Sequence, residues 1–181
     1  MKASSPIELR NSAMLLLGIE MGMRGCDIVK LKLRDIDWKN QTVRFTQDKT
    51  DVETILHMPA AVGNSIYRYI RDVRPKQTVD NHVFLRIGAP YCSLTRNACY
   101  SALKRAVPYR SVKGSGFHVT RKTFATSRLK EGVEPDRIMD AMGQRNRNSL
   151  TPYLSLDPER MRLCSLSLQS LGLLWRGGDW V

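Results

Sequence analysis

The spacing of apolar side chains changes early in the chain from a helical period to a period of two. Apolar residues recur at helical spacing over residues 7–21, and a second short helix is predicted over residues 26–31. Apolar and polar residues then alternate over residues 42–47 and 54–58, and the polar stretch 48–51 between them is typical of a hairpin turn. The sequence therefore predicts a small antiparallel β-sheet that follows two helices.

The next part of the chain returns to a helical period. Helices are predicted over residues 60–73, 94–107 and 117–130, with a short strand over residues 82–85. A further helix is expected over residues 135–143, because its opening proline suits a first turn and its closing glycine suits a helix end. We thus expect an α+β fold that is mainly α-helical and carries a small antiparallel β-sheet.

The charge of the chain favours a polyanionic partner. There are 29 Lys and Arg residues against 17 Asp and Glu residues, a formal net charge of +12. Nucleic acid is the first partner to expect from such a surplus, although a basic surface can also serve solubility. No run of about 18 apolar residues is present, so no membrane-spanning helix is predicted, and the N-terminus lacks a signal-peptide pattern.

The cysteines show no metal or disulfide pattern. Cys26, Cys92, Cys99 and Cys164 form no Cys-x-x-Cys pair and have no zinc-type spacing. We therefore expect reduced thiols in the cytoplasm, no metal site and no cofactor.

Cleaving a DNA strand without a metal requires a nucleophile, cations on the non-bridging oxygens and an acid for the leaving 5′ oxygen. His118 and Arg121 are three residues apart in a predicted helix, so both face one side and one phosphate could meet both. Without other evidence, such a pair is more often a surface pair.

Three more residues have both a chemical and a structural interpretation. Arg24 precedes a short predicted helix whose N-terminus favours an anion, and Asp27 is placed to orient a cationic neighbour. Lys49 lies at the predicted hairpin tip, from which a flexible ammonium could reach a DNA groove. The alternatives are an exposed turn arginine, a helix-start aspartate and a solvated turn lysine.

In their order along the chain, these residues resemble the motifs of tyrosine recombinases, the phage integrase family. Gly22-Met-Arg-Gly-Cys-Asp-Ile-Val-Lys-Leu31 is similar to the first arginine motif, and Gln47-Asp-Lys-Thr50 resembles the β-hairpin lysine motif. His118 and Arg121 match the family's His-x-x-Arg pair. The resemblance runs from about residue 7 to residue 164 and implies the tyrosine recombinase catalytic-domain fold.

The resemblance extends to a nucleophile. Met142-Gly-Gln144, nine residues ahead of Tyr153, resembles the Leu-Gly-His motif and the spacing of the family's tyrosine. The segment Tyr153-Leu-Ser-Leu-Asp157 is similar to integrases of mobile elements in Gram-positive bacteria. A packed tyrosine on an apolar helix is the structural alternative for this position.

The resemblance also implies roles for the matched residues. Arg24 and Arg121 would clamp the scissile phosphate, and Asp27 would support the clamp. His118 would assist proton handling and contact the phosphate, and Lys49 would protonate the departing 5′ oxygen. Double-stranded DNA is the implied partner.

Tyr153 would form a covalent 3′-phosphotyrosyl link, which implies site-specific DNA recombination by a mobile-element integrase. The family usually has His or Trp where this chain has Gln144. Glutamine donates a hydrogen bond but carries no charge, so we expect cleavage slowed by about 10- to 1000-fold, or hardly at all if the position is structural. A catalytically weakened or dead DNA-binding module and a type IB topoisomerase-like enzyme remain as alternatives.

Residues 1–162 are expected to form the catalytic domain. Residues 163–181 would form an apolar C-terminal tail that either covers its own core or docks on a neighbouring subunit. The resemblance implies a homo-oligomer on DNA, a tetramer, in the bacterial cytoplasm at the nucleoid. Tyrosine recombinases usually hold DNA between two domains, and the motifs of this chain belong to the C-terminal one. We therefore expect this chain to bind DNA weakly and in a salt-dependent way.

Overall fold

The computed structural model describes residues 5–107 and 116–144, together with the backbone of two short strands near the C-terminus. In chain order, the elements are α1 (Pro6–Glu20), α2 (Gly25–Lys30), the 3-10 helix η1 (Leu33–Asp35), β1 (Ile36–Asp37), β2 (Thr42–Thr46), β3 (Glu53–His57), α3 (Ala60–Asp72), α4 (Asn97–Ala106), α5 (His118–Lys130), α6 (Pro135–Met142), β4 (Trp175–Arg176) and β5 (Asp179–Trp180). The chain therefore has the expected α+β fold, mainly helical with a small three-stranded antiparallel sheet.

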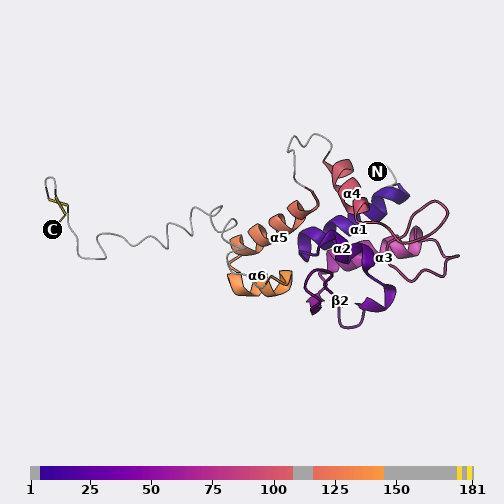
Figure 1. Ribbon diagram of the computed structural model, residues 1–181, viewed down its shortest axis with the longest axis horizontal. Coiled ribbons are helices and arrows are strands. Elements are labelled where there is room, and N and C mark those ends of the chain that lie inside the picture. The colour runs from indigo at the N-terminus through magenta and orange to yellow at the C-terminus, as the bar shows by residue number, and fades with distance from the viewer. Residues whose placement is uncertain (1–4, 108–115, 145–174, 177–178, 181) are drawn as a thin grey trace.

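α1 is the central helix, because it packs against α3, α4 and α5 (Figure 1). It begins at a capping box, in which the Ser5 hydroxyl accepts from the Glu8 backbone N–H at 3.3 Å and the Glu8 carboxylate accepts from the Ser5 N–H at 2.7 Å. Its inward side chains, among them Met14 and Leu17, are fully buried in the main core. The first predicted helix is thus the element around which the others are arranged.

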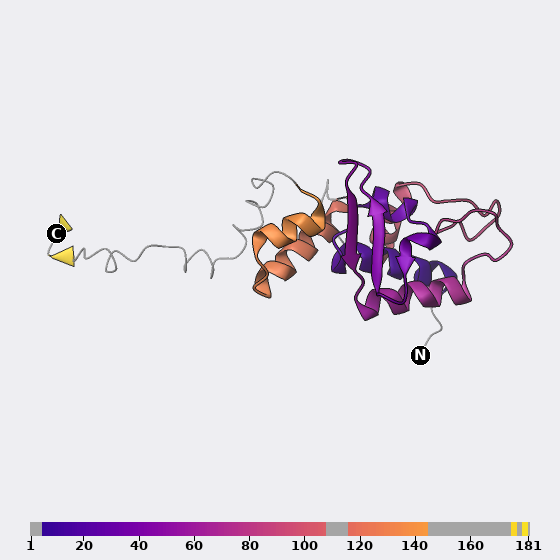
Figure 2. The same ribbon diagram turned by 90° about the horizontal axis from the view of Figure 1, so that it is seen from below.

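The sheet has the order β1–β2–β3 and is antiparallel throughout. Register pairs join Thr42 to His57 and Thr46 to Glu53. Val43 and Phe45 on β2 are buried against the main core, while Arg44 and Thr46 are exposed, as alternation requires. Residues 47–52 form the turn that joins β2 to β3 and closes one end of the hairpin (Figure 2).

α5 and α6 lie side by side at one end of the folded body in both views (Figures 1 and 2). Between them is a second hydrophobic cluster, distinct from the main core, made by Phe124, Ala125, Leu129, Ile138, Met139 and Met142. The turn between the two helices contains Gly132, which has a φ of +87°. The helix that carries the His-x-x-Arg pair therefore packs on α1 along one side and on α6 along another.

Several elements differ from the sequence-based prediction, among them η1, β4 and β5, which were not predicted. The strand predicted over residues 82–85 is wrong: His82 and Leu85 form isolated bridges with Lys32 and Ser93, and no ladder joins them. Val83, Phe84 and Leu85 are fully buried, so their apolar character reflects packing into the protein interior and not pairing in a sheet. Strand β1, which has two residues, was not predicted, since so short an element has no period to detect.

Candidate active site

Arg24 is placed by a sharp change of direction after α1. Gly22 has a φ of +64°, and a side chain there would have its Cβ 2.7 Å from the Phe124 ring of α5. The chain then enters α2 with Arg24 as the residue before the first turn. The guanidinium of Arg24 donates to the side-chain oxygen of Gln47 and, at 3.4 Å, to the carbonyl of Gly143. Arg24 therefore touches both the hairpin and the end of α6.

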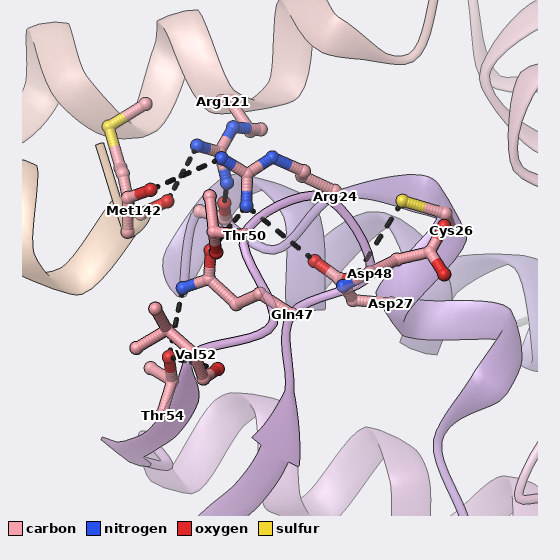
Figure 3. A network of polar contacts seen from close by, with 12 residues as sticks. Arg24, Cys26, Asp27, Gln47, Asp48, Thr50, Val52, Thr54, Arg121 and Met142 are labelled. Carbon is pink, nitrogen blue, oxygen red and sulfur yellow. Dashed lines mark hydrogen bonds and ion pairs between the residues drawn. The ribbon is translucent and has the colours of Figure 1, made fainter. Parts of the chain in front are cut away.

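Arg121 reaches the same place from α5. Its side chain is buried, with the residue only 3% exposed, and it donates to the carbonyl of Gly22 and, at 2.9 Å, to the carbonyl of Met142. The two arginines thus bind adjacent carbonyl oxygens, those of Met142 and Gly143. Figure 3 shows the two guanidinium groups close together beside Met142. Arg121 therefore reaches the same end of α6 as Arg24, although the two arginines lie far apart in the sequence.

The end of α6 presents these carbonyls because of its C-terminal turn. Gly143 is left-handed with a φ of +60°, and its N–H donates to the carbonyl of Asp140 at 2.9 Å. The N–H of Gln144 donates back to the carbonyl of Met139 at 2.9 Å, which completes a Schellman-type end. The prediction that Gly143 ends this helix is confirmed.

Gln144 follows directly and is half-buried. It lines a cavity of about 310 Å³ between α6 and β3, together with Asp140, Gly143 and the β3-side residues 52–55. The structure places its backbone beside the carbonyls that receive the two arginines. Tyr153, the sequence-predicted nucleophile, lies outside the described residues, as do Cys164 and the tail 163–174.

Lys49 lies in the turn between β2 and β3, as predicted, and is exposed. The turn is tied back to α2, because the Asp48 N–H donates to Asp27 Oδ1 at 2.9 Å and the Asp48 carboxylate pairs with Lys30. In the described part of the chain, the Lys49 ammonium has neither a hydrogen bond nor an ion pair. Its cation is thus held near the site without being neutralised there.

His118 begins α5, one turn before Arg121. Partial loss of water contact lowers the pKa of His118 below its ordinary value, and the positive charges of Arg121, Lys122, Arg24 and Lys49 lower it further. The positive charges of the two arginines and the hairpin lysine therefore all act on one imidazole. The structure thus brings together cationic groups from three separate segments: the start of α2, the β2–β3 turn and α5.

Asp27 is the buried acid of the site, with its side chain 1% exposed. Its Oδ2 lies 4.0 Å from the Arg24 guanidinium and, within the described residues, accepts no hydrogen bond. Its Oδ1 holds the lysine turn through the Asp48 N–H. One carboxylate thus contacts both the first arginine and the segment that carries Lys49.

The acceptors that hold the two arginines are mostly neutral. Gln47 and Gly143 accept from Arg24, and Gly22 and Met142 accept from Arg121. A carbonyl or amide orients a guanidinium without cancelling its charge, so these four contacts position the arginines and leave their positive charge in place. An arrangement of this kind suits stabilisation of a phosphate oxygen.

Sequence reasoning missed Gln47 as a separate functional candidate. It is 2% exposed and joins Arg24 to the hairpin through its side-chain amide (Figure 3). The signal that could have found it is a long polar residue just past the end of β2, where the alternation of Val43 and Phe45 predicts the next inward position.

The described residues contain neither a helix suited to crossing a membrane nor a cluster of three or more His, Cys, Asp and Glu side chains placed to hold a metal. Cys26, Cys92 and Cys99 are free thiols. Burial raises the pKa of the Cys99 thiol to about 12, which keeps it protonated and inert.

Comparisons with known proteins agree on one family. The phage integrase family model matches residues 1–160. A putative integrase/recombinase, y4gC of Sinorhizobium fredii, is 34% identical over 91% of this chain and 85% of its own length. The tyrosine recombinase XerD of Staphylococcus saprophyticus is 27% identical over 84% of this chain and 52% of its own length. The chain thus spans most of the first relative but only about half of the second.

Solved structures show the same fold. The XerH site-specific recombinase bound to its palindromic difH substrate, in a post-cleavage complex, superposes with a TM-score of 0.72 at 20% identity, covering 90% of this chain and 47% of that one. The XerA recombinase also gives a TM-score of 0.72 at 20% identity, covering 87% of this chain and 59% of that one. The sequence match over residues 1–160 and the shared fold lead to one assignment: this chain belongs to the phage integrase family, with the tyrosine recombinase catalytic-domain fold.

Proposed function

We propose that this chain is the catalytic domain of a site-specific DNA recombinase that cuts and rejoins strands through a covalent link to Tyr153. The observation that supports this most directly is the convergence of Arg24 and Arg121 on adjacent carbonyls of α6. His118 lies within the field of both arginines and of Lys49. Arg24, Arg121 and Lys49 supply three positive charges near the His118 imidazole, which suits a phosphodiester whose oxygens gain negative charge during displacement.

The reaction divides among these residues as follows. The Tyr153 hydroxyl oxygen attacks phosphorus and passes its proton to the neutral imidazole of His118, while the bond from phosphorus to the 5′ oxygen breaks. Lys49 gives a proton to the departing 5′ oxygen, and Arg24 and Arg121 hold the non-bridging oxygens. His118 contacts the phosphate and assists proton transfer. The 3′-phosphotyrosyl bond replaces the one broken, so a second 5′-hydroxyl reseals the strand by the reverse step.

The narrower proposals rest on sequence. Residues 1–162 would form the catalytic domain, and the leucine-rich tail in 163–181 would dock on a neighbouring subunit in a tetramer on DNA. A net charge of +12 supports a DNA partner and a place at the bacterial nucleoid in the cytoplasm. Relatives from both Sinorhizobium and Staphylococcus leave the element's Gram-positive origin resting on the Tyr153-Leu-Ser-Leu-Asp157 segment. The structural relatives include an integrase of transposon Tn1549, which accords with a mobile-element role.

Trapping of the tyrosine adduct tests the function. The chain is incubated at low salt with a pool of nicked duplexes of random sequence, in which the cleaved fragment diffuses away and prevents resealing. Protein-linked DNA that survives denaturation is recovered and sequenced. We expect enriched sites for the wild type and none for Tyr153→Phe, whereas Tyr100→Phe, at an exposed tyrosine of α4, keeps the adduct.

The outcomes separate the rival functions. Adducts that lead to strand exchange between two recovered sites support a recombinase. Adducts that relax a supercoiled plasmid without exchange indicate a type IB topoisomerase-like enzyme. DNA retention with no adduct from any sequence indicates a DNA-binding module without catalysis and contradicts the proposal.

A further inference from the structure

Gln47 is a buried amide at the exit of β2, where the hairpin turn begins. Gln47 is 2% exposed, whereas the other five residues between β2 and β3, 48–52, are exposed or half-buried. Burying an amide costs free energy unless each polar atom finds a partner. Every polar atom of this side chain has one, so the burial reflects a specific arrangement.

The partners of Gln47 lie in different segments. Its Oε1 accepts from the Arg24 guanidinium and from the Thr50 hydroxyl at 3.2 Å, and its Nε2 donates to the Thr54 hydroxyl at 2.9 Å. Its backbone carbonyl accepts the N–H of Asp51 at 2.9 Å, which closes the turn. One residue therefore joins the lysine turn, strand β3 and the first arginine.

The same amide also lies against the end of α6. A Cβ built on Gly143 would overlap the amide group of Gln47, so the side chain packs directly on the Gly143 backbone. Gly143 in turn accepts from Arg24 at 3.4 Å. Gln47, Arg24 and Gly143 thus meet at one point, which Figure 3 shows for the first two.

We propose that Gln47 is a positioning residue, which sets the turn carrying Lys49 against Arg24 so that acid and clamp act on the same phosphate. This inference rests on the proposed strand-cleavage function. Without the amide, Arg24 keeps its contacts to Gly143 and Asp27, but the turn loses the Thr50 bond and its link to Arg24. The main loss therefore falls on protonation of the 5′ oxygen by Lys49.

The Gln47 amide carries no charge, so it positions Arg24 without weakening the attraction of Arg24 for a phosphate. A glutamate at this position would accept from Arg24 equally well but would set a negative charge against the guanidinium. The clamp would then be held more tightly and would attract a phosphate less. Gln47→Glu is therefore expected to slow cleavage by weakening the clamp, which is a different defect from that of an apolar replacement.

The test compares two leaving groups at the DNA sites recovered as adducts. One substrate has the ordinary 5′ oxygen, and the other has a bridging 5′ sulfur at the scissile bond. A thiol has a pKa of about 8.5, so a thiolate departs without being protonated and no longer needs an acid. Single-turnover cleavage rates are measured for the wild type, Gln47→Met, Gln47→Leu, Lys49→Ala and Arg24→Ala. Gln77→Leu, at an exposed loop position, is the matched control.

We expect Gln47→Met and Gln47→Leu to cleave the oxygen substrate about 10- to 100-fold more slowly, part of what a general acid contributes. On the sulfur substrate both should return to within a few-fold of the wild type, as Lys49→Ala does, while Arg24→Ala stays slow on both. Gln77→Leu should match the wild type throughout.

Equal slowing of the Gln47 variants on both substrates, or wild-type rates on the oxygen substrate, would overturn the inference. Thermal unfolding shows whether each variant is folded, and Thr50→Val, which removes one partner of Oε1, offers a milder change that should give the same pattern at smaller size. A wild type that forms no adduct with either substrate would instead remove the proposed function, and this inference with it.

Discussion

Arg24 and Arg121 donate hydrogen bonds to the neighbouring carbonyl oxygens of Gly143 and Met142. Two guanidinium groups so close repel one another, and the carbonyl end of a helix carries partial negative charge that offsets this repulsion. The carbonyl oxygens at the end of α6 therefore bind both guanidinium groups and keep them side by side. The geometry needs the left-handed Gly143 to turn the chain away directly after these carbonyls.

Arg121→Lys is expected to lower both stability and cleavage. A lysine keeps the charge but cannot bind the Gly22 and Met142 carbonyls together and also clamp a phosphate. We expect a free energy of unfolding lower by about 1–3 kcal/mol, from an unsatisfied buried carbonyl, and cleavage slower by about 100- to 1000-fold. Chemical denaturation and single-turnover cleavage measure the two effects. The converse change at the exposed neighbour, Lys122→Arg, should alter neither, and equal effects at both positions would contradict the assignment.

Asp27→Asn is expected to loosen the lysine turn and disturb Arg24. The new amide can accept from the Asp48 N–H or from Arg24, but its NH₂ group then faces one of those donors. We expect the free energy of unfolding to fall by about 1–3 kcal/mol. Asp51→Asn removes the same charge at an exposed turn residue with a φ of +51°, a conformation that asparagine accepts, and should leave stability unchanged in urea denaturation. A similar loss in both variants would indicate a general charge effect.

His118 should give the protein a pH-dependent stability on the acid side of neutrality. Its pKa is lowered in the folded state, so the unfolded chain, with a value of about 6.5, binds the proton more readily. The contribution is complete above pH 6.5 and is lost as the pH falls from there through the folded-state value. Urea denaturation between pH 5.5 and 7.5 should show this slope, and His118→Gln should reduce it.

DNA should move the same titration the other way. A phosphate near His118 adds negative charge that favours the imidazolium, so the pKa of His118 is expected to rise when a duplex binds. Titration of the imidazole by NMR, with and without DNA, follows the change directly. A pKa of His118 that is the same in both states would place the phosphate elsewhere.

Gly18 is predicted to be necessary for the close approach of α5 to α1. A Cβ at this position would lie 2.5 Å from Thr120 Oγ1 and 2.9 Å from the Phe117 ring, so Gly18→Ala should destabilise the fold and displace the helix that carries Arg121. Gly63, inside α3, faces only the flexible end of Met58 at 3.3 Å. Gly63→Ala should therefore stabilise by up to about 1 kcal/mol, the helix propensity gain. Melting temperatures that shift in the same direction would contradict this contrast.

Gln144→His is expected to raise the rate of cleavage. Histidine restores the group usual in the family, which can carry charge and donate to a phosphate oxygen. We expect an increase of about 10- to 1000-fold in adduct formation on a nicked site, the range for one oxyanion donor. An unchanged rate would show that glutamine at position 144 does not slow cleavage. Gln144→Leu, slower than the wild type if the amide donates to phosphate, is the companion variant.

Periodicity was sufficient to predict α1 to α5 and the hairpin, because each of these elements turns one regular stripe of side chains inward. The end of α6 was also predictable, since a glycine marks the left-handed turn there. The run 82–85 was mistaken for a strand because a short apolar stretch packs into a core in the same way with or without a partner strand. Gln47 could not be assigned its role, because its partner Arg24 lies in a different element and an isolated glutamine has no period.

A hydrophobic cluster separate from the main core holds α6 on α5, so the site is complete only when α6 is packed in place. Six side chains between α5 and α6 hold the last described helix, while the main core lies elsewhere. Local opening of α6 would therefore leave most of the protein folded yet withdraw the carbonyls from both arginines. Amide hydrogen exchange in α6 then reports the fraction of molecules that are competent to cut, a quantity that global stability does not measure.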